Sequence, residues 1–191
     1  MTHQNNISAL ILAGGQASRF NFLDKGLLEW QGTPLIAHVI KQLAPQVGHI
    51  MISCNRNLAQ YQDFGYPCYS DSLSNFQGPL AGIQRGLEAC DTRYCLVCPC
   101  DMPTLPKDLS ERLYQTLLSS KADVSYVFDG ERKQYLLALI DCRTVGSLKS
   151  YLTSGKRSVW QWYETLNCQQ VDFSDYPATF HNLNTPELLR D

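Results

Sequence analysis

Two glycines and two cations close to the amino terminus form the arrangement in this sequence that is most typical of phosphate chemistry. An apolar run at residues 8–13 ends at Gly14 and Gly15, and Arg19 and Lys25 follow within a short loop. Paired glycines let backbone N–H groups approach an anion closely, and the two side chains add positive charge. The spacing matches neither the P-loop nor the dinucleotide-binding pattern. We therefore expect a nucleotide site of another kind.

Three aspartates are candidates for the same site. Asp101 comes three residues after the apolar segment 94–98, and the carboxyl end of a parallel strand is where open α/β sheets bind ligands. Because Mg²⁺ prefers one or two carboxylates with phosphate oxygens and water, we interpret Asp101 as a metal ligand in preference to a helix cap. Asp71 follows a weaker strand at 67–70, where ligand binding and ordinary turn chemistry are about equally supported. Asp24 is interpreted as an orienting or solvated neighbour.

The eight cysteines raise the alternative of a metal cluster. The spacing from Cys90 to Cys95 and Cys98 matches one used by plant-type iron–sulfur proteins. Against this, residues 94–98 are an apolar run, and a strand would direct Cys95 and Cys98 to opposite faces. Free cysteine is also among the most buried residue types. We expect reduced cysteines in the core, Cys100 included, in preference to cluster ligands.

Composition limits the class of protein. The chain has 191 residues with 44% hydrophobic content, enough for a sizeable core, and a single domain at 1–191 is the simplest expectation. Its net charge is −2 and its basic residues form no run, which disfavours a broad nucleic-acid or membrane surface. The polar amino terminus and the short apolar segment after it do not resemble a signal peptide or a membrane span. We expect a cytoplasmic protein.

The predicted elements alternate between strands and helices, which favours an α/β fold with a mostly parallel central sheet. Apolar runs predict strands at residues 8–13, 49–54, 67–70, 94–98, 123–128, 135–140 and 170–173. Helical spacing predicts helices at residues 34–43, at 78–89, from about 106, at 145–153 and at 159–166, with shorter ones ending near 64 and starting after 185. The glycine turn, Asp71 and Asp101 each follow one of these predicted strands.

Six motifs in a fixed order resemble the molybdenum cofactor guanylyltransferase family, and they extend over almost the whole chain. The motifs are LAGG at 12–15 with Arg19, DKGLL at 24–28, GTPL at 32–35, GPLAG at 78–82, PCDMP at 99–103 and NLNTPE at 182–187. The first is shared with the wider nucleotidyltransferase superfamily. The resemblance implies a three-layer Rossmann-like nucleotidyltransferase fold, and transfer of GMP from GTP to the terminal phosphate of molybdopterin with Mg²⁺ and release of pyrophosphate.

The resemblance also implies a role for each matching residue. On the nucleotide side, backbone groups would hold GTP, Arg19 and Lys25 would neutralise phosphates, and Asp101 would hold Mg²⁺. The nucleotide-binding positions are Leu12, Ala13, Gly14, Gly15, Lys25, Ser53, Asp71 and Asp101, and the acceptor-binding positions are Gly78, Pro79, Gly82, Arg157 and Asn182. The expected partners are GTP, molybdopterin and enzymes that receive the finished cofactor.

Three segments depart from the family pattern. Residues 20–23 are bulky where the family has glycine and methionine, Ser53 begins a segment that often starts with asparagine, and residues 134–136 replace a His-Pro-Thr sequence. The departures leave two alternatives open. One is a related transferase that uses CTP or a sugar-phosphate acceptor, and the other is a non-catalytic carrier of the nucleotide or cofactor.

Overall fold

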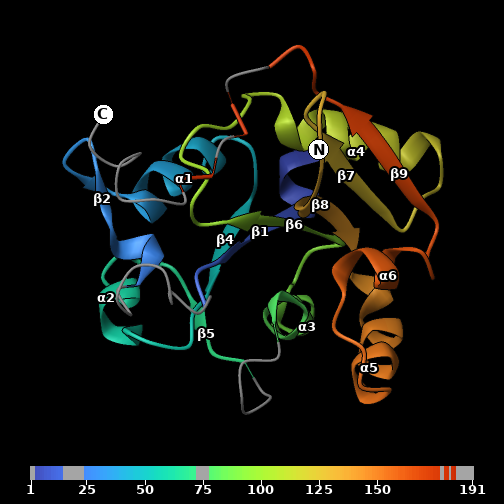
Figure 1. Ribbon diagram of the computed structural model, residues 1–191, viewed down its shortest axis with the longest axis horizontal. Helices are drawn as coiled ribbons and strands as arrows, with labels where there is room; N and C mark the ends of the chain where they lie inside the picture. Colours follow the sequence, from blue (N-terminus) through green and yellow to red (C-terminus); the bar gives the residue numbers. More distant parts are fainter. Residues whose placement is uncertain (1–2, 15–23, 72–77, 177–178, 181, 184–191) are drawn as a thin grey trace.

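A seven-stranded sheet forms the centre of the computed structural model, with helices on both of its faces (Figure 1). The structure describes residues 3–14, 24–71, 78–176, 179–180 and 182–183. In spatial order the strands are β5 (Cys68–Tyr69), β4 (His49–Ser53), β1 (Ile7–Leu12), β6 (Tyr94–Pro99), β8 (Lys133–Asp141), β7 (Val124–Phe128) and β9 (Cys168–Asp172). All seven predicted strands are therefore present in this sheet, with ends shifted by a few residues.

The sheet is mostly parallel, as expected, with one reversed strand. The pairs β5–β4, β4–β1, β1–β6 and β7–β9 are parallel, whereas β8 runs antiparallel to both β6 and β7. The reversal comes from a tight turn in which Asp129 Oδ1 accepts hydrogen bonds from the backbone N–H groups of Glu131 and Arg132. A turn this short can join only antiparallel neighbours, because a parallel connection needs a crossover.

Helices on each face produce the predicted three layers. Apolar residues of α1 (Leu35–Leu43), α2 (Leu58–Gln62) and α4 (Leu109–Ser119) share one core cluster, and those of α3 (Pro79–Ala89), α5 (Val145–Thr153) and α6 (Val159–Tyr163) share the other. The shorter elements are the 3-10 helices η1 (His3–Asn6), η3 (Lys25–Leu27) and η4 (Cys142–Thr144) and a hairpin of β2 (Glu29–Trp30) and β3 (Thr33–Pro34). The predicted helix after residue 185 lies outside the described residues.

Successive side chains of β1 and β6 point to opposite faces of the sheet, so each strand contributes to both core clusters. Ile11 lies in the cluster with α1 and α4, whereas Leu10 lies in the cluster with α3. Cys98 and Cys95 divide between the two clusters in the same way, which contradicts joint ligation of one metal cluster and supports their prediction as core residues. All eight cysteines are free thiols.

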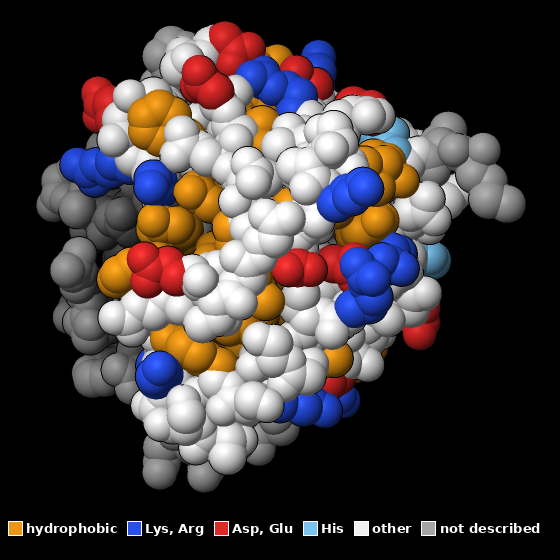
Figure 2. All heavy atoms as spheres, turned by 90° about the vertical axis from the view of Figure 1, so that its right-hand side faces the viewer, with side chains coloured by type: hydrophobic (Ala, Val, Ile, Leu, Met, Phe, Trp, Pro, Cys, Tyr) orange, Lys and Arg blue, Asp and Glu red, His pale blue; other side chains and the backbone are white. Residues whose placement is uncertain are grey.

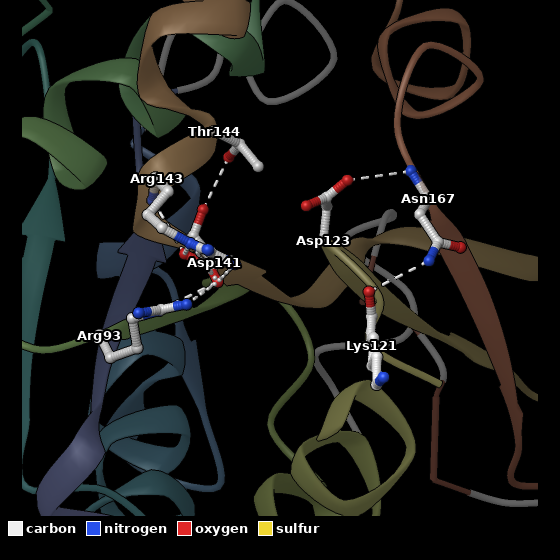
Figure 3. A network of polar contacts seen from close by, with 7 residues as sticks. All are labelled: Arg93, Lys121, Asp123, Asp141, Arg143, Thr144 and Asn167. Atoms are coloured by element: carbon white, nitrogen blue, oxygen red, sulfur yellow. Dashed lines mark hydrogen bonds and ion pairs between the residues drawn. The ribbon is translucent and has the colours of Figure 1, made fainter. Parts of the chain in front are cut away.

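A charged network holds the sheet at the end of β8, shown in Figure 3. Asp141 is 1% exposed, and its side chain accepts hydrogen bonds from the side chains of Arg93 and Arg143. The Thr144 hydroxyl donates to the Asp141 backbone carbonyl. Burial opposes ionisation of Asp141, but the arginine and backbone hydrogen bonds outweigh it and lower its pKa. Since Asp141 pairs with Tyr94, the first residue of β6, this network lies at the opposite end of β6 from Asp101.

The surface in Figure 2 carries Lys and Arg side chains interspersed with acidic and uncharged ones. On this face the positive side chains form no continuous stripe, in agreement with the slightly negative net charge of −2. Among the described residues, no helix has the length and apolar character needed to cross a membrane.

Candidate functional site

A cavity of about 460 Å³ opens at the carboxyl ends of β1, β4 and β6. It brings together backbone from the glycine turn, a cation, two carboxylates and the start of α3. Its lining residues are Leu12, Ala13, Gly14, Lys25, Ser53, Asp71, Gly78, Pro79, Gly82, Pro99, Cys100, Asp101 and Leu136. Most residues predicted from the sequence as site residues therefore border a single cavity, at the edge of the sheet where α/β folds bind ligands.

The glycine turn is held in place by both neighbouring strands. The Ala13 N–H donates to the Ser53 carbonyl at 2.8 Å, and the Cys100 N–H donates to the Leu12 carbonyl at 3.1 Å. A Cβ on Gly14 would lie 3.0 Å from Asn55 Nδ2, so the tight space explains why glycine occupies this position. Gly15, Arg19 and the unusual segment 20–23 lie outside the described residues.

Lys25 and Asp101 form an ion pair in the cavity wall. Lys25 begins η3, Asp101 follows β6, and the Lys25 ammonium contacts Asp101 Oδ2. Their side chains are 23% and 10% exposed, which places the pair at the boundary between the core and the cavity. The structure thus joins two residues that are 76 positions apart in the sequence and were predicted separately.

A second carboxylate anchors the turn that carries Lys25. Asp24 is 7% exposed, and it accepts hydrogen bonds from the Tyr61 hydroxyl and from Asn57 Nδ2. The Leu27 N–H donates to the Asp24 carbonyl at 3.1 Å, so the same residue starts η3. Asp24 is therefore a buried residue that holds the turn carrying Lys25.

Ser53 and Gly82 lie where α3 packs closely against β4. Ser53 is 3% exposed, and a Cβ on Gly82 would lie only 2.6 Å from Ser53 Oγ. The same Cβ would lie 3.4 Å from Asp71 Oδ1, so the helix, the strand and the carboxylate converge on one wall of the cavity. A residue larger than glycine at position 82 would fill this part of the cavity.

Asp71 has one oxygen engaged and one without a partner. Asn55 Nδ2 donates to Asp71 Oδ2 at 2.7 Å, and the Asp71 N–H donates to Asn55 Oδ1 at 2.8 Å. Asp71 Oδ1 is buried and has no hydrogen-bond partner among the described residues. Burial raises the pKa of Asp71, and the hydrogen bond from Asn55 acts in the opposite direction.

The residues predicted for the acceptor divide into two groups. Gly78, Pro79 and Gly82 line the cavity at the start of α3, where Gly78 has a φ of 78° that favours glycine. Arg157 and Asn182 are not among the residues that line it. Arg157 Nη1 donates to the carbonyls of Leu152 and Lys156, at 2.8 Å and 2.6 Å.

Asn182 lies beside the acidic turn, although it does not line the cavity. The N–H of its neighbour Leu183 donates to the Asp101 carbonyl at 3.1 Å, and Asn182 Oδ1 is buried without a hydrogen-bond partner among the described residues. The backbone hydrogen bond of Leu183 therefore holds Asn182 close to the turn that carries Asp101.

Several residues of the site were not predicted from the sequence. Pro99, Cys100 and Leu136 line the cavity, while Asn55 and Tyr61 support it from outside the lining. Pro99 and Cys100 could have been predicted, because they precede Asp101 in the PCDMP motif. Asn55 follows the end of β4 within two residues, which was a weak signal, and no local pattern pointed to Tyr61.

The donor set suits a hard cation held jointly with a ligand. Asp101 supplies one carboxylate at the cavity wall, and Mg²⁺ in nucleotide sites takes one or two carboxylates together with phosphate oxygens and water. Across the described ranges, no three His, Cys, Asp or Glu side chains gather into a metal cage. The residues present thus fit a metal that arrives with a phosphate-bearing ligand, with Lys25 adding charge beside it.

Comparison with known proteins agrees with this geometry. The MobA-like NTP transferase domain matches residues 9–171. A molybdenum cofactor guanylyltransferase of Shewanella sediminis is 44% identical over 181 residues, covering 95% of this chain and 92% of its own, and one of Cupriavidus necator is 42% identical over 195 residues, covering 100% and 98%. The solved structure of molybdopterin-guanine dinucleotide biosynthesis protein A from Archaeoglobus fulgidus has a TM-score of 0.78 at 22% identity, covers 96% of this chain and 95% of its own, and shares the fold.

Proposed function

Because the chain belongs to the MobA-like NTP transferase family, we propose that it transfers GMP from GTP to the terminal phosphate of molybdopterin and releases pyrophosphate. The observation that best supports this reaction is the cavity in which the glycine turn faces Lys25 and Asp101. Backbone N–H groups, an ammonium and a carboxylate are the groups that a magnesium–nucleotide substrate requires.

The nucleotide is proposed to lie along the ends of β1 and β4. The backbone of Leu12, Ala13 and Gly14 borders the cavity, and Gly15 and Arg19 extend the same element as proposed phosphate contacts. Ser53 and Asp71 border the part of the cavity next to α3, and we assign them to the nucleoside. A carboxylate would repel phosphate, which is why Asp71 is not assigned to the triphosphate.

Asp101 is proposed to hold Mg²⁺ together with the phosphates of GTP. When bound, the ion would neutralise phosphate charge and polarise the phosphoryl oxygens. In the structure the ammonium of Lys25 contacts the same carboxylate, so its charge neutralises Asp101. Lys25 is then well placed to move onto the phosphates once the nucleotide supplies a stronger negative charge.

The acceptor is proposed to enter from the start of α3. Gly78, Pro79 and Gly82 form that wall, and we assign Asn182 and Arg157 to the same substrate as more distant contacts. Both substrates are polyanions, so the main task of the protein is to align them and neutralise their charge. An ionised phosphate is already a nucleophile, and the transfer requires no general base.

The remaining assignments concern the setting of the enzyme. We propose that residues 1–191 act as one nucleotidyltransferase domain in the cytoplasm, where GTP is available. The product is a finished cofactor, so the enzymes that contain this cofactor are its proposed recipients. Neither nucleic acid nor a membrane surface is needed by this reaction.

Pyrophosphate release is the direct test. Purified protein is incubated with molybdopterin and Mg²⁺ and with GTP, CTP, ATP or UTP in turn, and release is followed by a coupled assay. Turnover with GTP alone supports the proposal, and turnover with CTP alone contradicts it. Tight GTP binding without pyrophosphate would instead identify a carrier, and turnover with a sugar phosphate in place of molybdopterin would identify a different acceptor.

A further inference from the structure

Asn55 and Asp71 form a closed pair at the ends of two neighbouring strands. Asn55 comes two residues after β4, Asp71 comes two residues after β5, and the two strands are paired in parallel. One hydrogen bond joins the side chains, and the other joins the Asp71 N–H to the Asn55 side chain. The pair therefore fixes both the backbone and the carboxylate of Asp71.

The amide side chain makes both bonds at once through two separate atoms. The Asn55 side chain donates through Nδ2 and accepts through Oδ1, whereas a carboxylate in its place could only accept and an alanine could do neither. Asn55 also lies beside the glycine turn, because a Cβ on Gly14 would lie 3.0 Å from Asn55 Nδ2. The two bonds to Asp71 set the orientation of the amide, and glycine at position 14 leaves space for it.

This arrangement leaves Asp71 Oδ1 as an acceptor that needs a donor. The atom is buried without a partner among the described residues, and its residue lines the cavity. A buried acceptor is unfavourable until it is hydrogen-bonded, so a ligand that brings an N–H or O–H group to this point gains affinity. The bound nucleotide carries such groups on its base and on its ribose.

We propose that Asn55 is a positioning residue, which holds Oδ2 of Asp71 so that Oδ1 meets a hydrogen-bond donor on the nucleoside of the bound substrate. The proposal rests on the proposed function, since it takes the cavity to be the nucleotide site. It adds a residue that does not line the cavity and acts only through Asp71.

Among the described residues, burial and the Asn55 hydrogen bond are the two influences on the pKa of Asp71. The nearby thiols stay neutral, because burial raises the pKa of Cys54 to about 12 and also raises that of Cys68. On α3, Gly82 faces Asp71 without a side chain, and the Arg85 guanidinium is held over the Tyr69 ring. The state of Asp71 is therefore governed mainly by its burial and by Asn55.

A thermodynamic cycle tests the proposal. The affinity for GTP without Mg²⁺ or acceptor is measured for the wild type, Asn55→Ala, Asp71→Ala and the double variant. Asn55→Ala should weaken binding about tenfold, or ~1.4 kcal/mol, in the wild type and leave it unchanged in the Asp71→Ala background. An equal loss in both backgrounds, or no loss in the first, would overturn the proposal.

Matched variants separate positioning from folding. Asn167→Ala removes an amide whose Nδ2 donates to the Lys121 carbonyl far from the cavity, and it should leave GTP affinity unchanged (Figure 3). Asn55→Ser keeps a single hydrogen-bonding group and should recover part of the affinity lost in Asn55→Ala. The pH dependence of GTP affinity gives an independent readout, because Asn55→Ala should raise the pH below which binding weakens.

Nucleotide analogues identify the donor on the nucleoside. They also separate failure of the proposed function from failure of the proposed role of Asn55. If the 2-amino group of guanine supplies it, Asn55→Ala should cause no further loss of affinity for inosine triphosphate, which lacks that group. If the ribose 2′-hydroxyl supplies it, the same should hold for 2′-deoxy-GTP. An equal further loss with these two analogues and with 1-methyl-GTP and 3′-deoxy-GTP, which lack the donors at N1 and O3′, would overturn the proposal. If the wild type binds CTP and not GTP, the proposed function fails while the same cycle, run with CTP, still tests the pairing of Asn55 with Asp71.

Discussion

Replacing Tyr61 with phenylalanine should weaken the fold measurably, because its hydroxyl donates to the buried carboxylate of Asp24. Tyr61 is 0% exposed and Asp24 is 7% exposed, so water cannot readily replace the lost donor. A hydrogen bond to a charged group contributes about 1.5–3 kcal/mol. For a chain of this size, a loss of about 2 kcal/mol lowers the melting temperature by roughly 4–8 °C.

The same substitution should also slow the reaction. Asp24 starts the turn η3 that carries Lys25, and Asn57 Nδ2, at 3.3 Å, would be its remaining side-chain donor among the described residues. A less constrained turn holds the Lys25 ammonium less well at the proposed phosphate site. We expect kcat/KM for GTP to fall about tenfold, which corresponds to ~1.4 kcal/mol of transition-state stabilisation.

Thermal unfolding and pyrophosphate release measure the two effects. Tyr163→Phe is the matched control, because Tyr163 is only 2% exposed and its hydroxyl donates to a neutral acceptor, the Tyr135 carbonyl, at 3.1 Å. Removing this hydrogen bond should lower the free energy of unfolding by about 1 kcal/mol and the melting temperature by roughly 2–4 °C, with little change in turnover. Equal stability losses in the two variants, or full activity in Tyr61→Phe, would refute the reasoning.

Three further predictions concern packing and charge. Gly82→Ala places a Cβ 2.6 Å from Ser53 Oγ, so it should displace Ser53, which is assigned to the nucleoside, and weaken GTP binding about tenfold, or ~1.4 kcal/mol, measured by calorimetry. Gly86→Ala places a Cβ 2.3 Å from Leu10 Cδ2. It should lower the free energy of unfolding by about 1–3 kcal/mol without changing the KM for GTP. Asp141→Asn should lower stability by about 1–3 kcal/mol at pH 7. The folded-state pKa of Asp141 is depressed, so its contribution is present above the unfolded value of about 3.9 and disappears as pH falls through the folded value; urea unfolding at several pH values checks this.

The fold and the centre of the site follow from local sequence signals. The apolar run of β1 ends at glycines, the run of β6 ends at Asp101, and both strands pair in parallel, so their ends had to meet. The reversal of β8 was less evident, because alternating strands and helices favour parallel pairing and only the Asp129 turn contradicts it.

The supporting residues could not be predicted, for a physical reason. The contacts of Tyr61 with Asp24 and of Asn55 with Asp71 join residues 37 and 16 positions apart. Periodicity reports which face of an element is buried, and it carries no information on which polar groups meet across elements. Tyr61 has the same pattern as any aromatic core residue on a short helix.

The most direct test of the central claim compares turnover with metal-free GTP binding in Asp101→Asn. The claim is that Asp101 serves Mg²⁺-assisted transfer while the glycine turn binds the nucleotide through its backbone. Loss of a carboxylate from the metal removes several kcal/mol of charge stabilisation, so turnover should fall by about 100-fold or more, with GTP affinity without Mg²⁺ within about threefold of the wild type. Turnover near the wild-type rate, or an equal loss of binding and turnover, would contradict the account.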